Sequence, residues 1–355
     1  MADALVESAR QAWSTGASYL LAQQAADGGW HSQTYGQLKD GAAVTALVCF
    51  ALTRIPADLR PKPDDKVTKG LAFLARGLAK RGTIASPDGS LDFPTYAGAL
   101  WLLARGRVAE PDADGQRVRD YLLAAQVAEP RGFLPDSPSY GGWDFLGKED
   151  AQGITTGTNV SVTRHVVEAL QTNQPPDAPP PLATSALKRA RAYLERCQNP
   201  DGGLAFTCEP MSQNNKAAYA DDKLAEPRSY GTATCDGILG LVACGMPADD
   251  ERIVKAVAWL AKRPGLALVP GFEGLPPEAG WQRGLRYYYY AGLARVLPRF
   301  PQPDIAPRRE ALVKQLVSLQ QASGAWVNES DRMRENDPLI ATSLAIIALA
   351  ACVTG

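Results

Sequence analysis

The hydrophobic and polar positions of this chain follow two kinds of helical pattern in alternation. In the first kind, apolar residues recur at helical spacing with charged or amide residues between them, as in a helix with one buried face. In the second kind, charges are few and apolar residues occupy every side, which favours burial all round. The first pattern predicts six outer helices, over 4–24, 66–80, 116–127, 183–197, 250–262 and 308–321. The second predicts six inner helices, over 40–52, 95–105, 159–171, 232–244, 285–297 and 338–353.

One short frame recurs in the predicted inner helices. Threonine is followed seven residues later by leucine in five copies, which begin at Thr45, Thr95, Thr163, Thr234 and Thr342. A sixth copy begins at Tyr287. Such a recurring unit is typical of an array of helix pairs, none of which buries its apolar face alone. We therefore predict an all-α fold, an (α/α)6 toroid of six inner and six outer helices, as a single domain over 1–355.

Charge and cysteine content indicate which binding partners and which cellular compartment to expect. The 37 basic and 38 acidic residues leave a net charge of −1, which does not favour nucleic acid. The 6 cysteines have no close pairs and are expected to be buried thiols. The first residues lack the basic–apolar pattern of a secretory signal, which favours a cytoplasmic location. An apolar loop, 265–272, could cover a cavity as a lid or make a peripheral membrane contact.

Three segments at the predicted ends of outer helices share a glutamine and a glycine turn. They are QQAADGGW (23–30), CQNPDGGLAF (197–206) and LQQASGAW (319–326). These segments resemble the glutamine–tryptophan repeats of the terpene cyclase and prenyltransferase superfamily, as in squalene–hopene cyclases. The nearest resemblance is to single-toroid bacterial proteins, common in planctomycetes, that are labelled prenyltransferase and squalene oxidase repeat proteins. The resemblance covers nearly the whole chain and implies a toroid that holds a hydrophobic isoprenoid in its central cavity.

The catalytic groups of that superfamily do not carry over. Class II cyclases protonate their substrate with a DxDD segment just before the inner-helix threonine. The equivalent positions here include Asn159–Val162 and Tyr230–Ala233, and none of the six copies holds paired carboxylates. Without a charged neighbour and its hydrogen bonds, a carboxyl there would not become a strong acid. The sequence therefore argues against DxDD-type protonation.

A zinc site of the protein prenyltransferase kind is also incomplete. Asp236 aligns with the ligand aspartate of those enzymes, but Ile238 replaces the ligand cysteine and no histidine follows His165. Cys235 beside Asp236, with His165, is the one substitute set of ligands. We expect neither a metal nor another cofactor.

The repeat frame places one layer of side chains at the same height in the ring. Two residues after each frame start lie Leu47, Ala97, His165, Asp236, Tyr289 and Leu344. Three of these six are polar although their helices are otherwise apolar. We predict that His165 and Asp236 face the central cavity as a catalytic acid and base. The alternative is a buried pair with a structural role.

Aromatic and arginine side chains gather near the starts of the inner helices, at one rim of the ring. An aromatic lining would stabilise carbocations through cation–π attraction, and guanidinium groups match the oxygens of a diphosphate. The predicted substrate-binding residues are Tyr96, Trp143, Tyr230, Trp281, Arg286, Tyr287 and Tyr289. The alternative is that the aromatic residues fill the core and that the arginines are solvated.

Three classes of function fit these features. The first, which we favour, is an isoprenoid-handling enzyme of the cyclase or prenyltransferase kind. The second is a catalytically silent toroid that binds a hydrophobic ligand or a protein partner. The third is a glycan-active (α/α)6 enzyme, which would need two carboxylates at a cleft.

Overall fold

The computed structural model describes residues 3–56, 59–60, 65–81, 83–84, 93–147, 157–172, 185–210, 212, 215–220, 226–276, 280–300 and 305–354. Across these ranges the secondary structure is helical, apart from two isolated β-bridges. The outer helices are α1 (Asp3–Ala22), α3 (Asp65–Arg81), α5 (Ala113–Ala124), α7 (Ser185–Arg196), α9 (Glu251–Ala261) and α12 (Ile305–Ser318). The inner helices are α2 (Ala42–Arg54), α4 (Pro94–Arg105), α6 (Val160–Gln171), α8 (Gly231–Ala243), α11 (Arg286–Val296) and α13 (Pro338–Thr354). A one-turn helix, α10 (Trp281–Gly284), precedes α11.

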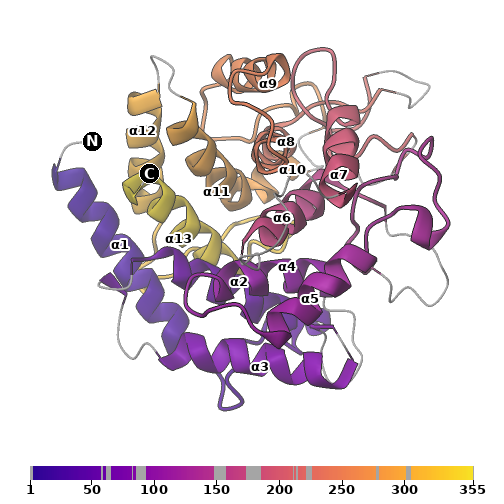
Figure 1. Cartoon of the computed structure of the whole chain (residues 1–355). Helices are drawn as coiled ribbons and strands as arrows, with labels where there is room; N and C mark the ends of the chain where they lie inside the picture. Colours follow the sequence, from indigo (N-terminus) through magenta and orange to yellow (C-terminus); the bar gives the residue numbers. More distant parts are fainter. Residues whose placement is uncertain are drawn as a thin grey trace.

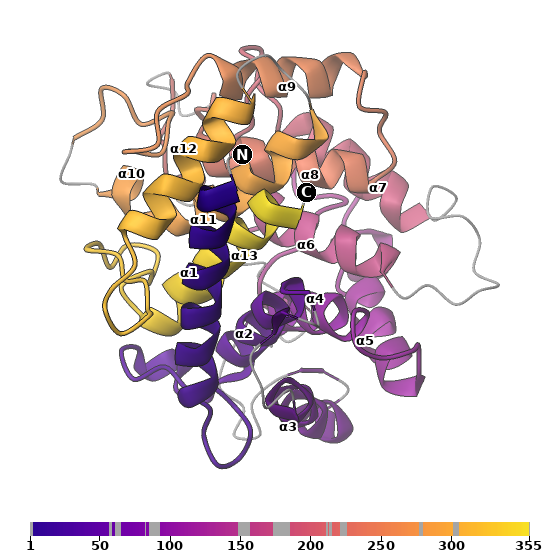
Figure 2. The ribbon, with the colours of Figure 1, turned by 90° about the vertical axis from the view of Figure 1, so that its left-hand side faces the viewer.

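The inner helices form a closed ring. Each packs against the next in the order α2, α4, α6, α8, α11 and α13, and α13 packs against α2. Figure 1 shows these helices around the centre, with the outer helices outside them. The ring closes between the two ends of the chain, where α1 packs against both α12 and α13 (Figure 2). The predicted all-α (α/α)6 toroid is confirmed.

Burial follows the two sequence patterns. Every residue of α2 except Arg54 is buried, as expected for an inner helix. The outer helix α9 instead buries a stripe that includes Ile253, Ala256, Val257 and Leu260, at the spacing of one helical face. Helix limits differ from the prediction by a few residues, because caps set them. The side chain of Asp112, for example, accepts a hydrogen bond from Gly115 N and starts α5 at Ala113.

Three predicted limits lie outside the residues that the structure describes. The predicted start of the fourth outer helix, Ala183, lies outside the described residues. The limits of the predicted single domain, 1–355, stay a prediction.

Four corners between an outer helix and the next inner helix share one set of hydrogen bonds. In each, a glutamine amide donates to a carbonyl in its own turn and to another outer helix. Gln24 Nε2 donates to Gly28 O and to Lys66 O, both at 2.8 Å. Gln126, Gln198 and Gln320 make the equivalent pairs of bonds. The four glutamines thereby connect α1 to α3, α5 to α7, α7 to α9 and α12 to α1.

Tryptophan and threonine complete three of these corners. Each indole N–H donates to a carbonyl of the preceding outer helix, and each tryptophan backbone N–H donates to the hydroxyl of the frame threonine. The pairs are Trp30 with Thr45, Trp143 with Thr163 and Trp326 with Thr342. In the fourth corner Leu204 N donates to Thr234 Oγ1 at 3.0 Å. The recurring threonine therefore holds the first turn of the inner helix against the corner.

Each corner also contains a glycine in the left-handed region of backbone space. These glycines are Gly28, Gly141, Gly202 and Gly324, with φ of 92°, 94°, 92° and 89°. A Cβ atom on Gly202 would lie 2.8 Å from the carbonyl oxygen of Lys255 in the neighbouring outer helix. The corner therefore requires glycine both for its backbone conformation and for its close approach to that helix.

We expect Gly202→Ala to lower the free energy of unfolding by about 1–3 kcal/mol, because left-handed strain and the carbonyl contact add together. Urea denaturation would measure the loss. Gly36→Ala is the control, because no atom lies within 4 Å of a Cβ at Gly36. Equal stability of the Gly202 variant and the wild type would contradict the requirement.

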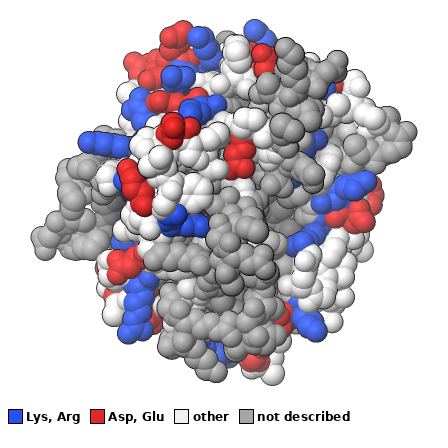
Figure 3. Space-filling model, turned by 90° about the vertical axis from the view of Figure 1, so that its right-hand side faces the viewer, with Lys and Arg blue, Asp and Glu red and all other residues white. Residues whose placement is uncertain are grey.

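On the face seen in Figure 3, acidic and basic side chains are interspersed outside the grey regions, and neither sign of charge predominates there. No helix in the described part of the chain is long and apolar enough to cross a membrane. Leu268 is exposed in the apolar loop 265–272. A peripheral membrane contact through this loop stays a prediction.

Candidate active site

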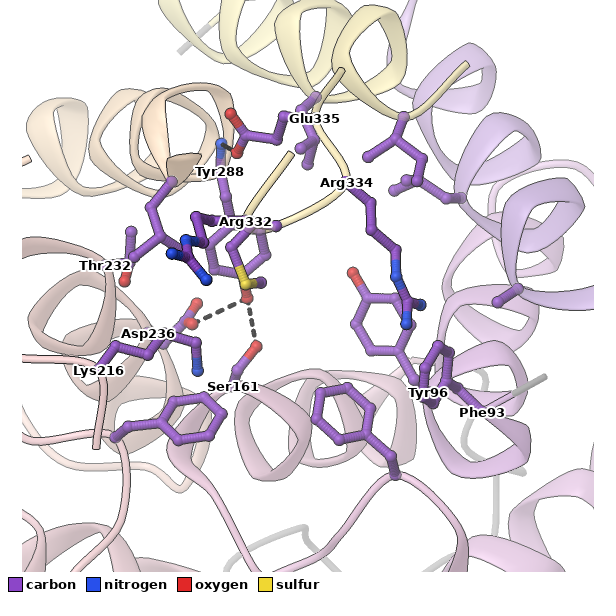
Figure 4. A pocket seen from close by; sticks show the side chains of 18 of the residues that line it. Phe93, Tyr96, Ser161, Lys216, Thr232, Asp236, Tyr288, Arg332, Arg334 and Glu335 are labelled. Atoms are coloured by element: carbon purple, nitrogen blue, oxygen red, sulfur yellow. Dashed lines mark hydrogen bonds between the residues drawn. The ribbon is translucent and has the colours of Figure 1, made fainter. Parts of the chain in front are cut away.

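A cavity of about 300 Å³ lies at the end of the ring where the inner helices begin. All six inner helices contribute to its wall, through residues that include Val44, Leu47, Tyr96, Ser161, Thr232, Asp236, Tyr288, Ile340 and Leu344. Loops complete it with Phe93, Phe145, Phe206, Lys216 and the segment 332–335. Figure 4 shows Lys216 and Arg332 on the side of Asp236, with Arg334 near Tyr96 and Phe93 across the opening.

Asp236 is a buried carboxyl group in this mostly apolar wall, with 2% of its surface exposed. Its Oδ2 accepts a hydrogen bond from the hydroxyl of Tyr288 at 2.8 Å, and that hydroxyl also bonds Ser161 Oγ (Figure 4). Arg164 Nη1 lies 3.8 Å from Oδ1. Burial raises the pKa of Asp236 to about 6, against the opposing effects of Arg164 and Tyr288. The carboxyl group can therefore give or take a proton in the range near neutral pH.

His165 lies in the floor beneath this cavity, against the ring of Tyr96 with centroids 4.9 Å apart. Its Nδ1 donates to Ser161 O at 2.8 Å, and its Nε2 faces Arg164 Nη1 at hydrogen-bond distance. A guanidinium group only donates, so Nε2 is the acceptor and Nδ1 carries the hydrogen. Burial, and then the charge of Arg164, lower the pKa of His165 well below 6.5. The imidazole is therefore neutral across the physiological range.

His165 and Asp236, which were predicted to act as an acid and base, are linked in the structure through a third residue. Arg164 Nη1 contacts both side chains and links them. The charge of Arg164 stabilises the carboxylate of Asp236 and disfavours protonation of His165. Of these two residues, Asp236 is the one whose pKa is shifted toward neutral pH.

The other predicted site residues fall in three places. Tyr96 and Tyr230 line the cavity. Trp281 of α10 and Arg286 of α11 do not line it, and Arg286 forms a two-point ion pair with Glu329 at 2.8 and 2.6 Å. The ring of Trp281 lies near two cations of the cavity wall, 5.6 Å from Lys216 and 6.0 Å from Arg332.

Three predicted residues are buried away from the cavity wall. Trp143 belongs to a corner, with its indole N–H bonded to Leu122 O. Tyr287 and Tyr289 are fully buried on α11, and the hydroxyl of Tyr289 accepts a hydrogen bond from Arg308. The predicted layer holds in part, because Leu47, Asp236 and Leu344 line the cavity. In α4 and α11 the lining residues are instead Tyr96 and Tyr288, one position before the predicted Ala97 and Tyr289.

Lys216 and Glu335, two of the four charged loop residues that line the cavity, were missed by the sequence analysis. The amine of Lys216 lies 3.5 Å from the centre of the Phe206 ring, and burial lowers its pKa to about 8. Glu335 accepts hydrogen bonds from the backbone N–H groups of Tyr287 and Tyr288, at 2.9 and 2.8 Å, and caps the start of α11. Burial raises the pKa of Glu335 to about 7. Both residues come from loops, where no helical pattern indicates which side chains turn inward.

Within the described ranges, no three histidine, cysteine or acidic side chains come together as possible metal ligands. Cys235, the neighbour of Asp236, faces α11 instead. A Cβ atom on Gly292 of that helix would lie 2.9 Å from Cys235 Cβ. Burial raises the pKa of the Cys235 thiol above its ordinary value, which disfavours the thiolate that zinc requires.

No protein-family model matches the chain, and no curated protein matches its sequence. Solved structures do match its fold. A variant of the type II terpene cyclase MstE from Scytonema, in complex with the product merosterolic acid A, has a TM-score of 0.67 at 15% identity, covering 100% of this chain and 99% of that chain. A second MstE variant, in complex with the substrate geranylgeranyl dihydroxybenzoate, has a TM-score of 0.66 at 15% identity, covering 99% of both chains.

The chain has the terpene cyclase toroid fold. This confirms the fold that the sequence resemblance implied. A glycosidase has a similar structure, with a TM-score of 0.58 at 16% identity, covering 100% of this chain and 99% of that chain. Proteins with this fold therefore catalyse more than one kind of reaction, so the function has to be inferred from the residues of the site.

Proposed function

We propose that this terpene cyclase-like protein binds an isoprenoid in the cavity and that Asp236 exchanges a proton with it. The observation that carries the proposal is a carboxyl group with a pKa of about 6 in a wall that is mostly aromatic and aliphatic. A buried ionisable group that faces a cavity is typical of a functional site. The rings of Tyr96, Phe145, Phe206 and Tyr288 would stabilise a carbocation formed there. The prenylated ligands of MstE give the proposal further support.

The acidity of Asp236 indicates which substrate group it would protonate. An isolated alkene is a very weak base and requires a strong acid, whereas burial makes Asp236 a weaker acid than an ordinary carboxyl group and so favours a more basic acceptor, such as an oxygen atom. We therefore propose an isoprenoid that bears an epoxide or carbonyl oxygen at the end next to Asp236. The proton passes from the carboxyl to that oxygen, and the resulting carboxylate can take a proton from the cation later. Tyr288 positions the carboxyl throughout.

A polar head on the same isoprenoid would lie at the mouth of the cavity. Lys216 and Arg332 line the wall near Asp236, and Arg334 lies across the opening (Figure 4). Cationic donors in this arrangement suit a diphosphate or another anionic group. The apolar part of the ligand would then lie against the aromatic and aliphatic wall of the cavity.

Glycoside hydrolysis fits the wall less well. That reaction generally uses two carboxyl groups that both face the substrate. Glu335 is the second carboxyl group in the wall, but its oxygens accept the N–H groups of Tyr287 and Tyr288 and the amide of Asn328. These bonds commit Glu335 to holding the start of α11.

A catalytically silent toroid that binds a hydrophobic ligand is the second candidate. It is favoured by the missing DxDD segment, because none of the equivalent positions holds the paired carboxylates that would make a strong acid. The same cavity would then serve binding alone.

The test is organic extraction and mass spectrometry of freshly purified protein, together with incubation at pH 5.5 and 7.5. The added compounds are farnesyl diphosphate, geranylgeranyl diphosphate, squalene and an epoxide of squalene. We expect conversion of an oxygen-bearing isoprenoid, faster at pH 5.5. A bound but unconverted isoprenoid would favour the silent toroid, and failure to bind any of them would contradict both candidates.

We expect Tyr288→Phe to shift the pH dependence of turnover. The hydroxyl of Tyr288 stabilises the carboxylate of Asp236, so its removal raises the pKa of Asp236 further. If the protonated carboxyl is the reactive form, turnover is full below this pKa and falls as pH rises through it. The fall should move up by about one pH unit. Tyr290→Phe is the control, because the hydroxyl of Tyr290 donates to Leu266 O, away from the cavity wall. If the pH profile of turnover in Tyr288→Phe were the same as in the wild type, the role of Asp236 would be contradicted.

A further inference from the structure

A second cavity, of about 240 Å³, lies at the opposite end of the ring, where the inner helices end. Four arginines line it: Arg54 ends α2, Arg107 follows α4, Arg295 lies near the end of α11, and Arg299 belongs to the short helix η7 (Leu297–Arg299). The other residues described in its wall are Pro298, Ala350, Ala351 and Thr354. We call this the arginine cavity. Its described wall contains no acidic side chain.

Three of these arginines form no ion pair within the described part of the chain. Arg54 lies over the ring of Phe50, 5.2 Å from its centre, and Arg299 donates to the carbonyl oxygen of Arg295. Arg107 is exposed at the edge of the cavity. Burial, and then the charge of Arg107, lower the pKa of Arg54 to about 10. Positive charges are therefore held close together here at a cost in free energy.

Arg295 is buried, with 7% of its surface exposed, and uses only part of its hydrogen-bonding capacity. Its Nη2 donates to Glu168 Oε1 at 2.7 Å, whereas Nε and Nη1 have no partner among the described residues. A buried guanidinium N–H without an acceptor is costly, because it has lost water and gained nothing in exchange. Nε and Nη1 are shielded from solvent, so an anion in the arginine cavity would act on Arg295 through charge attraction and not as a hydrogen-bond acceptor for these two atoms.

The charges inside the ring do not neutralise this cluster. Glu168 lies between Arg295, at 2.7 Å, and Arg164, at 3.3 Å, and Arg164 in turn faces Asp236 at 3.8 Å. These two arginines and two carboxylates balance one another when Asp236 is ionised. Among the residues that the structure describes, the positive charges of Arg54, Arg107 and Arg299 are in excess of this balance.

We propose that the arginine cavity binds a phosphate-class polyanion, with a diphosphate group as the best fit. Guanidinium groups match phosphate oxygens through paired hydrogen bonds, and several of them converge here. With a volume of about 240 Å³ and four guanidinium groups in its wall, the cavity can admit an anion with several oxygens, such as a diphosphate. The site lies at the other end of the ring from the isoprenoid cavity, and its assignment does not depend on the function proposed for that cavity.

The first test is calorimetric titration of the full chain with inorganic diphosphate at low salt. We expect saturable binding by the wild type, weakened tenfold or more in the double variant Arg107→Gln/Arg299→Gln. Both side chains are exposed, so the variant should fold normally. The double variant Arg10→Gln/Arg117→Gln removes the same charge from exposed positions elsewhere and should bind as the wild type does. Binding that survives in the first variant, or falls equally in both, would overturn the proposal.

A second test distinguishes a free phosphate group from a lipid headgroup. The protein is floated with vesicles of phosphatidylcholine alone or with added phosphatidate. Capture by the phosphatidate vesicles that the Arg107→Gln/Arg299→Gln variant loses would assign the site to a phosphate on a lipid. Diphosphate binding without capture would assign it to a soluble phosphate compound. If the wild type binds neither diphosphate nor phosphatidate vesicles, the proposal is wrong.

Discussion

Asp236→Asn is expected to remove turnover while making the fold more stable at pH 8. A positioned proton donor typically accelerates a reaction by about 10²–10⁴-fold, and asparagine has no proton to exchange in this range. The amide oxygen can still accept the hydrogen bond that Tyr288 donates, so the wall keeps its shape. We therefore expect turnover to fall at least about 100-fold, with isoprenoid binding retained. Product formation and ligand affinity measured on one preparation would separate the two effects.

The stability effect follows from the direction of the pKa shift. Burial raises the pKa of Asp236 from 3.8 to about 6, so the folded state binds a proton more tightly than the unfolded chain does. The stability that this proton provides is present below pH 4 and is lost as pH rises through 6. At pH 8 the ionised carboxylate costs the fold at most about 3 kcal/mol, given a shift from 3.8 to about 6. Asparagine removes that cost, so the variant should gain stability at pH 8 and gain none at pH 4.

Asp112→Ala provides a control of opposite sign. The side chain of Asp112 caps α5, so its loss should lower stability by about 1 kcal/mol without changing turnover. Urea denaturation at pH 4 and at pH 8 would compare the two variants. Undiminished turnover in Asp236→Asn would remove this carboxyl from the mechanism. Lower stability of that variant at pH 8 would show that its attraction to Arg164 outweighs its burial.

The fold could be predicted from the sequence because two independent signals agree. The all-round apolar pattern of segments such as Ala42–Arg54 indicates an inner helix, and the one-sided pattern of Glu251–Ala261 indicates an outer one. The spacing of the frame threonines gives the number of helix pairs. Thr45, Thr163 and Thr342 make equivalent hydrogen bonds to a corner tryptophan, so the repeat in sequence corresponds to a repeat in structure.

The residue that lines the cavity could be predicted only in helices whose frame threonine accepts a hydrogen bond from the corner. In α2, α6, α8 and α13 a frame threonine accepts a backbone N–H, and the residue two positions later faces the cavity or its floor. In α4 the hydroxyl of Thr95 has no partner among the described residues, and α11 has Tyr287 in its place. In these two helices the lining position moves by one residue, to Tyr96 and Tyr288. The shift of the lining position therefore coincides with the loss of this hydrogen bond.

The loop residues of the wall were beyond prediction for a different reason. Lys216 and Glu335 reach the cavity because their loops are held by local contacts, such as the bonds from Glu335 to the start of α11. A loop sequence carries no period that marks its inward positions. A buried acid in a charged loop, such as DRMRENDP at 331–338, looks like a solvated residue until its partners are known.

Trp143→Ala is expected to destabilise the fold by about 3–5 kcal/mol and to leave the isoprenoid cavity intact. Trp143 is fully buried in its corner, with its indole N–H bonded to Leu122 O at 2.7 Å and its backbone N–H bonded to Thr163. Truncation leaves a large void beside α6 and an unpaired carbonyl. Trp143→Phe fills most of the space and loses only the indole bond, so it should cost about 1–3 kcal/mol.

Tyr96→Leu makes the matched comparison, because the sequence analysis assigned Tyr96 and Trp143 the same role and the structure places only Tyr96 in the cavity wall. Its loss should weaken isoprenoid binding more than it changes stability, since leucine keeps the packing and removes the aromatic face. Urea denaturation gives the stability of each variant, and isoprenoid affinity is measured where all of them are folded. If Trp143→Phe weakened binding as much as Tyr96→Leu at unchanged stability, Trp143 would contact the ligand after all. The opposite pattern would establish that aromatic residues at this rim divide into corner residues, which hold the ring together, and wall residues, which face the ligand.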